Sequence, residues 1–67
     1  MIEITMISGK IYYKKMEQST ERSNVGDMQK LMSGRGNAVE AYSTESFNQE
    51  DKVFLSPFNI ESFRIIL

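Results

Sequence analysis

Histidine, cysteine and tryptophan are all missing from this 67-residue chain, and proline occurs once. Without cysteine there are no disulfide bonds or thiolate metal sites, and without histidine only oxygen ligands remain for a metal ion. A hydroxyl nucleophile would also lack an imidazole base, which leaves lysine and carboxylates as the available bases. No spacing of residues singles out an acid, a base and a nucleophile. The sequence therefore predicts a protein that is not an enzyme and uses no cofactor.

Long apolar runs and a charge excess of one sign are missing as well. The apolar run at 65–67 holds three residues, whereas a membrane-spanning helix needs about 20. Glu3 and the lack of an early basic cluster argue against a signal peptide, so we expect a cytoplasmic protein without membrane contact. Eight basic and nine acidic residues give a net charge of −1, and no overall field directs the chain toward nucleic acid.

The length of the chain predicts a single domain, residues 1–67, with a small core. A chain of this size buries only about 60% of its unfolded surface. Disulfides and thiolate sites are excluded, so self-association is the expected source of further burial, and we predict a homo-oligomer.

Residues 1–16 have the clearest pattern. MIEITMI is rich in β-branched residues, Ser8-Gly9 is a two-residue turn signal, and KIYYKKM resumes a β-prone run, which predicts a hairpin. With Ser8-Gly9 as the loop, Ile4 lies opposite Tyr13, and the apolar side chains share one face. The opposite, solvent-exposed face then carries Glu3, Thr5, Lys10, Tyr12 and Lys14.

The middle of the chain predicts a loop over 17–24 followed by one short helix. Asn24 is placed to cap this helix, and apolar residues from Val25 to Met32 recur at helical spacing on one face. Gly34 is suited to end it.

The remaining segments predict strands. Residues 37–47 fit either a strand or a helix that begins at a capping box, and the confident strand KVFLS that follows favours a second hairpin through the polar turn NQED. Pro57 ends that strand, residues 59–62 resemble a single helical turn, and FRIIL closes the chain as a strand. The predicted fold is α+β, with a curled or barrel-like, mostly antiparallel sheet of about five strands in the order β-β-α-β-β-β.

Two candidate recognition sites follow. Lys10, Tyr12 and Lys14 would project together, as on sheets that stack bases and hold phosphates, although Glu3 opposite Lys14 neutralises part of the patch. In the loop Gly34-Arg35-Gly36, backbone N–H groups and the guanidinium could hold an anion, although a helix C-cap explains the glycines equally well. We interpret these residues as a surface for a protein partner, with nucleic-acid or nucleotide binding as the alternative.

The C-terminal third is unusually rich in apolar side chains on both strand faces. All four phenylalanines lie there, and one short helix cannot cover them together with the last three residues. The terminus either tucks under the helix or meets another copy of the chain. The residues predicted for the oligomer interface are Phe54, Phe63, Ile65 and Leu67.

The layout of an N-terminal hairpin around ISGK, one short helix and a closing VFLSPFNIESF stretch resembles small orphan β-rich proteins of bacteria and their phages. The resemblance covers the whole chain and implies an accessory protein that acts by binding. The sequence thus predicts a non-enzymatic, oligomeric binding or regulatory protein that contacts a macromolecular partner.

Overall fold

A computed structural model describes residues 1–33 and 37–67. The predicted anion loop, Gly34 to Gly36, lies outside the described residues. Within them the chain forms five strands and one α-helix, which confirms the predicted fold class and element order. The elements are β1 (Ile2–Met6), β2 (Ile11–Lys14), α1 (Glu21–Met32), β3 (Val39–Tyr42), β4 (Lys52–Leu55) and β5 (Ile60–Ile65), with 3-10 turns at Gln49–Asp51 (η1) and Pro57–Asn59 (η2).

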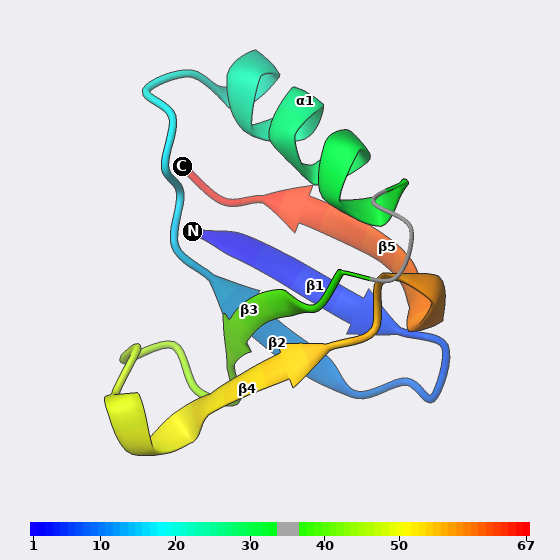
Figure 1. Cartoon of the computed structure of the whole chain (residues 1–67). Coiled ribbons are helices and arrows are strands. Elements are labelled where there is room, and N and C mark those ends of the chain that lie inside the picture. Colours follow the sequence, from blue (N-terminus) through cyan, green and yellow to red (C-terminus); the bar gives the residue numbers. More distant parts are fainter. Residues whose placement is uncertain (34–36) are drawn as a thin grey trace.

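The sheet has the strand order β4-β3-β2-β1-β5, and every neighbouring pair is antiparallel. It is not closed into a barrel, so β4 and β5 are its two edges. The β3–β4 ribbon folds across one face of the β2-β1-β5 sheet, and α1 packs beside it against β5 (Figure 1). The core lies between these layers.

The N-terminal hairpin is confirmed, but its predicted register is wrong by one residue. Ile4 lies opposite Tyr12, and Glu3 lies opposite Tyr13. Because opposite residues share a face, Tyr12 is on the core side with Ile4, and Tyr13 is on the outer side with Glu3. The two tyrosines have therefore exchanged the faces that the sequence predicted for them.

The register differs because the hairpin loop has three residues, 7–9, instead of two. The backbone N–H of Gly9 donates to the Met6 carbonyl at 2.8 Å, and the N–H of Met6 donates to the Lys10 carbonyl at 2.9 Å. Gly9 has φ 90°, the left-handed conformation that completes a three-residue hairpin loop. Gly9 is thus the position that sets which face of β2 meets the core.

The helix α1 starts earlier than predicted, at Glu21 instead of just after Asn24. Thr20 caps it, because its Oγ1 accepts a hydrogen bond from the N–H of Ser23 at 3.1 Å. The predicted loop over 17–24 therefore ends at Thr20, and Asn24 lies inside the helix with only 1% of its surface exposed.

Asn24 has a structural role that the sequence did not reveal. Its Nδ2 donates to the carbonyls of Gln18 at 3.1 Å and of Thr20 at 2.7 Å, and its Oδ1 accepts the N–H of Gln18 at 3.3 Å. These bonds hold the segment that connects β2 to α1 against the helix.

The C-terminal half follows the prediction more closely. Residues 37–47 contain the strand β3, the NQED segment forms the turn η1, and KVFL forms β4. The predicted helical turn over 59–62 is wrong, because the turn lies at Pro57–Asn59 and Ile60 already begins β5. Pro57 with its fixed φ suits the start of a 3-10 turn.

The core is a single cluster drawn from β1, β3, β4, β5 and α1. Met28 contributes from the helix and has 0% of its surface exposed, as has Ile4 from β1. The buried apolar members are Ile2, Ile4, Met6, Met28, Val39, Ala41, Leu55 and Ile60. No helix within the described ranges is long and apolar enough to cross a membrane.

Candidate functional site

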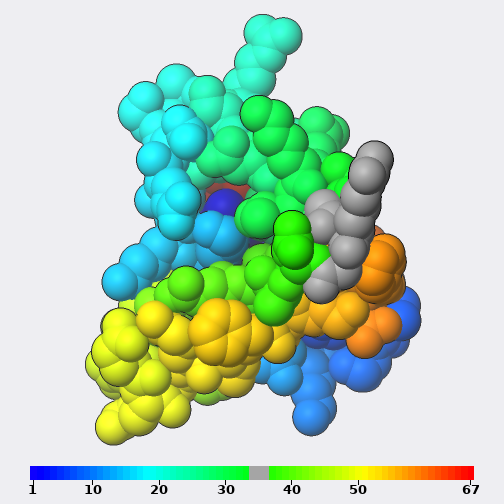
Figure 2. Space-filling view, viewed as in Figure 1, coloured from blue at the N-terminus to red at the C-terminus, as the bar shows by residue number. Residues whose placement is uncertain are grey.

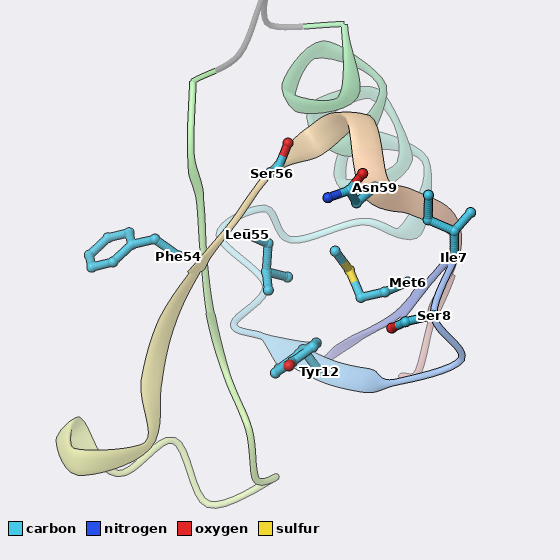
Figure 3. A pocket seen from close by; sticks show the side chains of 8 residues that line it. All are labelled: Met6, Ile7, Ser8, Tyr12, Phe54, Leu55, Ser56 and Asn59. Atoms are coloured by element: carbon cyan, nitrogen blue, oxygen red, sulfur yellow. The ribbon is translucent and has the colours of Figure 1, made fainter.

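An open groove of about 480 Å³ lies between the β1–β2 hairpin loop on one side and β4 with η2 on the other. Its inner wall is apolar: the side chains of Met6, Tyr12 and Leu55 point into it, with the amide of Asn59 among them (Figure 3). The lining residues are Met6, Ile7, Ser8, Tyr12, Phe54, Leu55, Ser56 and Asn59.

Large apolar side chains surround this groove on the surface. Ile7 at the hairpin loop is 63% exposed and Phe54 on β4 is 67% exposed. The ring of Phe54 points away from the groove, onto the outer face of β4 (Figure 3). Phe58 on the adjoining η2 is 69% exposed. Large exposed apolar side chains near one groove point to a candidate interaction site.

β4 also presents a free backbone edge, whose polar groups follow from its pairing with β3. The N–H of Ser43 donates to the Asp51 carbonyl at 2.9 Å, which makes this pair a hydrogen-bonded one. Hydrogen-bonded and non-hydrogen-bonded pairs alternate in an antiparallel ladder, and Tyr42 opposite Lys52 comes next. The backbone groups of Lys52 and Phe54 therefore point away from β3, toward the open edge. The N–H of Lys52 donates to the Gln49 carbonyl of η1, which leaves the carbonyl of Lys52 and both groups of Phe54 at the edge.

The charge on this edge is neutralised locally. The Nζ of Lys52 lies 2.8 Å from Glu40 Oε1 on the neighbouring strand. The hydrogen bond from Lys52, with its positive charge, holds the pKa of Glu40 below its usual value, and the same hydrogen bond raises the pKa of Lys52. Lysines that repel other strands commonly guard sheet edges, and here the one lysine of β4 is paired within the chain.

An aromatic pair lies on the outer face at the end of β3. The ring of Tyr42 meets the ring of Phe47 edge-on at 5.3 Å between centroids, and Lys15 lies 5.5 Å from the Tyr42 centroid. Phe47 has φ 56°, an unfavourable conformation for a bulky residue. Only 4% of Tyr42 is exposed, so this cluster is packed and offers no aromatic platform.

The predicted recognition face on the hairpin is not formed. Lys10 lies at the exposed end of the hairpin loop, whereas Tyr12 is half-buried and packs against the core. The side chain of Lys14 is 14% exposed and lies 3.8 Å from Glu17. The prediction that Lys10, Tyr12 and Lys14 project together from the outer face is therefore wrong, because the register shift turned Tyr12 inward. Arg35 lies outside the described residues.

The structure separates the residues predicted for the oligomer interface. Phe54 is on the edge strand β4, while Phe63 and Ile65 are on β5 at the other edge, half-buried against the core. Leu67 follows β5 and is 84% exposed. Phe54 alone of the four lines the groove.

Sequence reasoning missed Ile7 and Asn59, which the groove brings together. The backbone N–H of Ile7 donates to the Asn59 carbonyl at 2.8 Å, so the hairpin loop is held against η2. The one sequence signal was an isoleucine beside the turn residues Ser8-Gly9, where a polar residue is usual.

The groove is chemically suited to binding. Its polar groups are hydroxyls and one amide, and none of its eight lining residues is an acid or a base that titrates near neutral pH. No group of three or more acidic residues that could hold a metal ion occurs in the part of the chain that the structure describes.

A second hollow lies between α1 and the β3–β4 ribbon (Figure 2). It is lined by charged residues of both signs, including Lys14, Asp27, Lys30 and Glu40. Such mixed charge gives no preference for a ligand of one sign, so the apolar groove remains the stronger candidate.

Comparison with known proteins identifies relatives of this chain only at the level of a family. No curated protein and no solved structure matches it. A family model described as "Family of unknown function (DUF7209)" matches residues 1–67, the whole chain. The chain belongs to this family.

Proposed function

We propose that this protein is a small, self-associating binding protein without catalytic function, which contacts a protein partner through the apolar groove between the hairpin loop and β4. The observation that carries the proposal is the exposure of Ile7 at that groove, 63% of its surface, together with the exposed ring of Phe54 on the outer face of the adjoining β4, 67% of its surface. The free energy of removing such side chains from water, roughly 25 cal/mol per Å², favours association with another apolar surface.

The character of the groove supports a peptide segment as the bound group. Apolar walls with a few hydroxyl and amide groups suit an apolar side chain flanked by backbone amides.

Nucleic-acid binding has weaker support. Tyr12, the one aromatic of the predicted face, packs against the core and cannot stack on a base. The outer-face ring of Tyr42 is covered by Phe47 and Lys15.

The proposal is tested by affinity capture from cells that express the gene, with a charged substitution at the groove and a matched one elsewhere. Ile7→Lys places a charge at the groove, whereas Ile11→Lys places the same charge on an exposed isoleucine of the same hairpin that does not line it. We expect one protein to be retained by the wild type and by Ile11→Lys and to be lost with Ile7→Lys.

Retention of that protein by all three forms would show that the groove is not its binding site. Recovery of nucleic acid in place of a protein, in a form that Lys10→Ala removes, would support the alternative. Circular dichroism of both variants ensures that each is folded.

A further inference from the structure

We propose that β4 pairs antiparallel with β4 of a second copy around a two-fold axis, with Phe54 opposite Phe54 of the second copy. The inference rests on the self-association in the proposed function and assigns its interface. The backbone groups, side chains and charges of β4 complement those of a second copy in one register.

The backbone N–H and C=O groups of β4 alternate in direction along the strand, and this restricts the possible registers. The groups that point to the open edge belong to Lys52 and Phe54, because Val53 and Leu55 direct theirs toward β3. The N–H of Lys52 already donates to the Gln49 carbonyl of η1, so both groups of Phe54 and the carbonyl of Lys52 are the ones left to a second copy. A hydrogen-bonded pair between two copies must therefore join positions 52, 54 or 56 of one copy to one of these positions of the other. A two-fold axis pairs positions that lie symmetrically about it, so an axis at Lys52, Val53, Phe54 or Leu55 satisfies this condition.

Three of the four registers have an unfavourable contact. An axis at Lys52 places two lysines opposite each other. An axis at Val53 places the Asp51 carboxylate opposite Leu55, at the apolar groove. An axis at Leu55 places Pro57 of η2, whose backbone is not extended, opposite Val53.

The register centred on Phe54 has none of these contacts within the strand, because Pro57 falls opposite Asp51, beyond the ends of β4. Phe54 meets Phe54 on the outer face, where cross-strand aromatic pairs are favourable. Val53 meets Leu55 on the inner face, so the groove of each copy gains an apolar neighbour. Lys52 lies opposite Ser56, and its charge stays paired with Glu40 at 2.8 Å. The net charge of −1 per copy adds little repulsion.

The other edge of the sheet is less available to a second copy. The inner face of β5 packs against α1, and its half-buried side chains Phe63 and Ile65 belong to the chain's own core. Its outward side chains include Glu61 and Arg64, which are exposed. A strand with charged side chains of this kind is protected against pairing with another edge.

The chain contains no cysteine, so single cysteine variants report the interface directly. In the proposed register the two Cα atoms at position 54 are about 5.5 Å apart, within disulfide range, and those at position 53 are about 7–8 Å apart. Under mild oxidant at tens of micromolar protein, we expect Phe54→Cys to form disulfide dimers about tenfold faster than Val53→Cys. Glu61→Cys, exposed on β5, is the matched control and should be as slow.

Each outcome decides the proposal. Faster dimerisation of Val53→Cys would place the axis at Val53 and overturn the register, because Cα atoms there would be about 4.5 Å apart. Equal rates for all three variants would overturn the β4 interface altogether. Circular dichroism of the reduced variants checks that they are folded.

The unmodified protein provides an independent measurement. Between about 1 mM and 10 μM, a range that brackets the weak association expected of a short strand interface, the amide resonance of Phe54 should shift more than that of Glu61. Unchanged spectra on dilution would argue against the dimer. The partner-capture experiment with Ile7→Lys can succeed or fail independently, so the two proposals are separable.

Discussion

The two edges of the sheet differ in how they are protected. β5 is held on its inner face by α1, and its side chain Arg64 lies 3.2 Å from Glu3 of the neighbouring strand. At the end of the same ladder, the N–H of Ile66 donates to the Met1 carbonyl at 2.8 Å. β4 has no helix beside its outer face, and its largest side chain, Phe54, is 67% exposed. The chain covers one face of β5 with its own helix, and it leaves the outer face of β4 exposed.

This difference shows that similar apolar sequence can serve two purposes. VFL on β4 and FRI at the end of β5 both carry large apolar side chains. Whether such residues form core or interface depends on where the helix packs. Substitutions at the protected edge, β5, should change folding. Substitutions at the open edge, β4, should change association.

The largest effect is expected at Met28, the fully buried residue by which α1 joins the core. Met28→Ala should lower the free energy of unfolding by about 2–5 kcal/mol, because it removes buried methylene groups and leaves a cavity. A domain of this size has roughly 3–10 kcal/mol in total. Urea denaturation measures the change, with Met28→Leu as the conservative control that should cost less than about 1.5 kcal/mol. Equal stability of the alanine variant would mean that α1 does not protect β5.

The next effect concerns Asn24, which ties the linker to α1. Asn24→Ala should cost about 1–3 kcal/mol, because the carbonyls of Gln18 and Thr20 lose a donor in a partly buried site. Thermal unfolding followed by circular dichroism measures the loss. Gln29→Ala, on the exposed side of the same helix, should stay within about 0.5 kcal/mol of the wild type. Similar values for the two variants would contradict the anchoring role.

A matched pair of phenylalanines compares the edges directly. Phe63→Ala on β5 should cost about 1–3 kcal/mol, because that side chain is half-buried against the core. Phe54→Ala on β4 should change the stability of the monomer by less than about 0.5 kcal/mol. Urea titrations at low micromolar concentration keep association out of the measurement. The comparison breaks down if Phe54→Ala is the more destabilising of the two.

The smallest effect is expected from the exposed pair of Glu40 and Lys52. The lowered pKa of Glu40 in the folded chain means that its contribution to stability is present above the pKa of an unfolded glutamate and is lost as the pH falls through the folded pKa, below about pH 5. The raised pKa of Lys52 gives a contribution that is lost as the pH rises through the folded pKa in the alkaline range.

Glu40→Gln should therefore be slightly less stable than the wild type at neutral pH and should approach it in acid. Denaturation curves at pH 7 and pH 3 test this, with Glu45→Gln in the exposed loop as the control. A constant difference between the two pH values would mean that the ion pair does not contribute.

Much of the fold could be predicted from the sequence. The β-branched run of β1, the turn signal at Ser8-Gly9 and the helical spacing of the apolar residues near Met28 are local patterns, and each corresponds to an observed element. The register of the first hairpin could not be predicted in the same way. Both faces of β2 carry an apolar side chain, so the alternation in that strand does not distinguish a two-residue loop from a three-residue one.

The helix start shows a different limit. Asn24 and Thr20 are both good N-cap residues, and local propensity favours neither strongly. The longer helix prevails because Asn24 makes three hydrogen bonds to the connecting segment when it lies inside the helix.

The apolar character of the candidate site could be predicted from the sequence, but the residues that form it could not. Excess apolar residues in the C-terminal third predicted an interface, and Phe54 is one of the large apolar side chains that the structure leaves exposed. Ile7 and Asn59 are 52 positions apart in the chain, and only folding brings them to one groove.

By itself, the sequence determined which elements form, which chemistries are excluded and how little charge the chain carries, because these properties depend on neighbouring residues and on composition. The tertiary structure decided which tyrosine faces the core, which sheet edge the helix protects and where exposed apolar side chains gather. Those outcomes depend on contacts between residues far apart in the chain, where one residue of register exchanges the two faces of a strand.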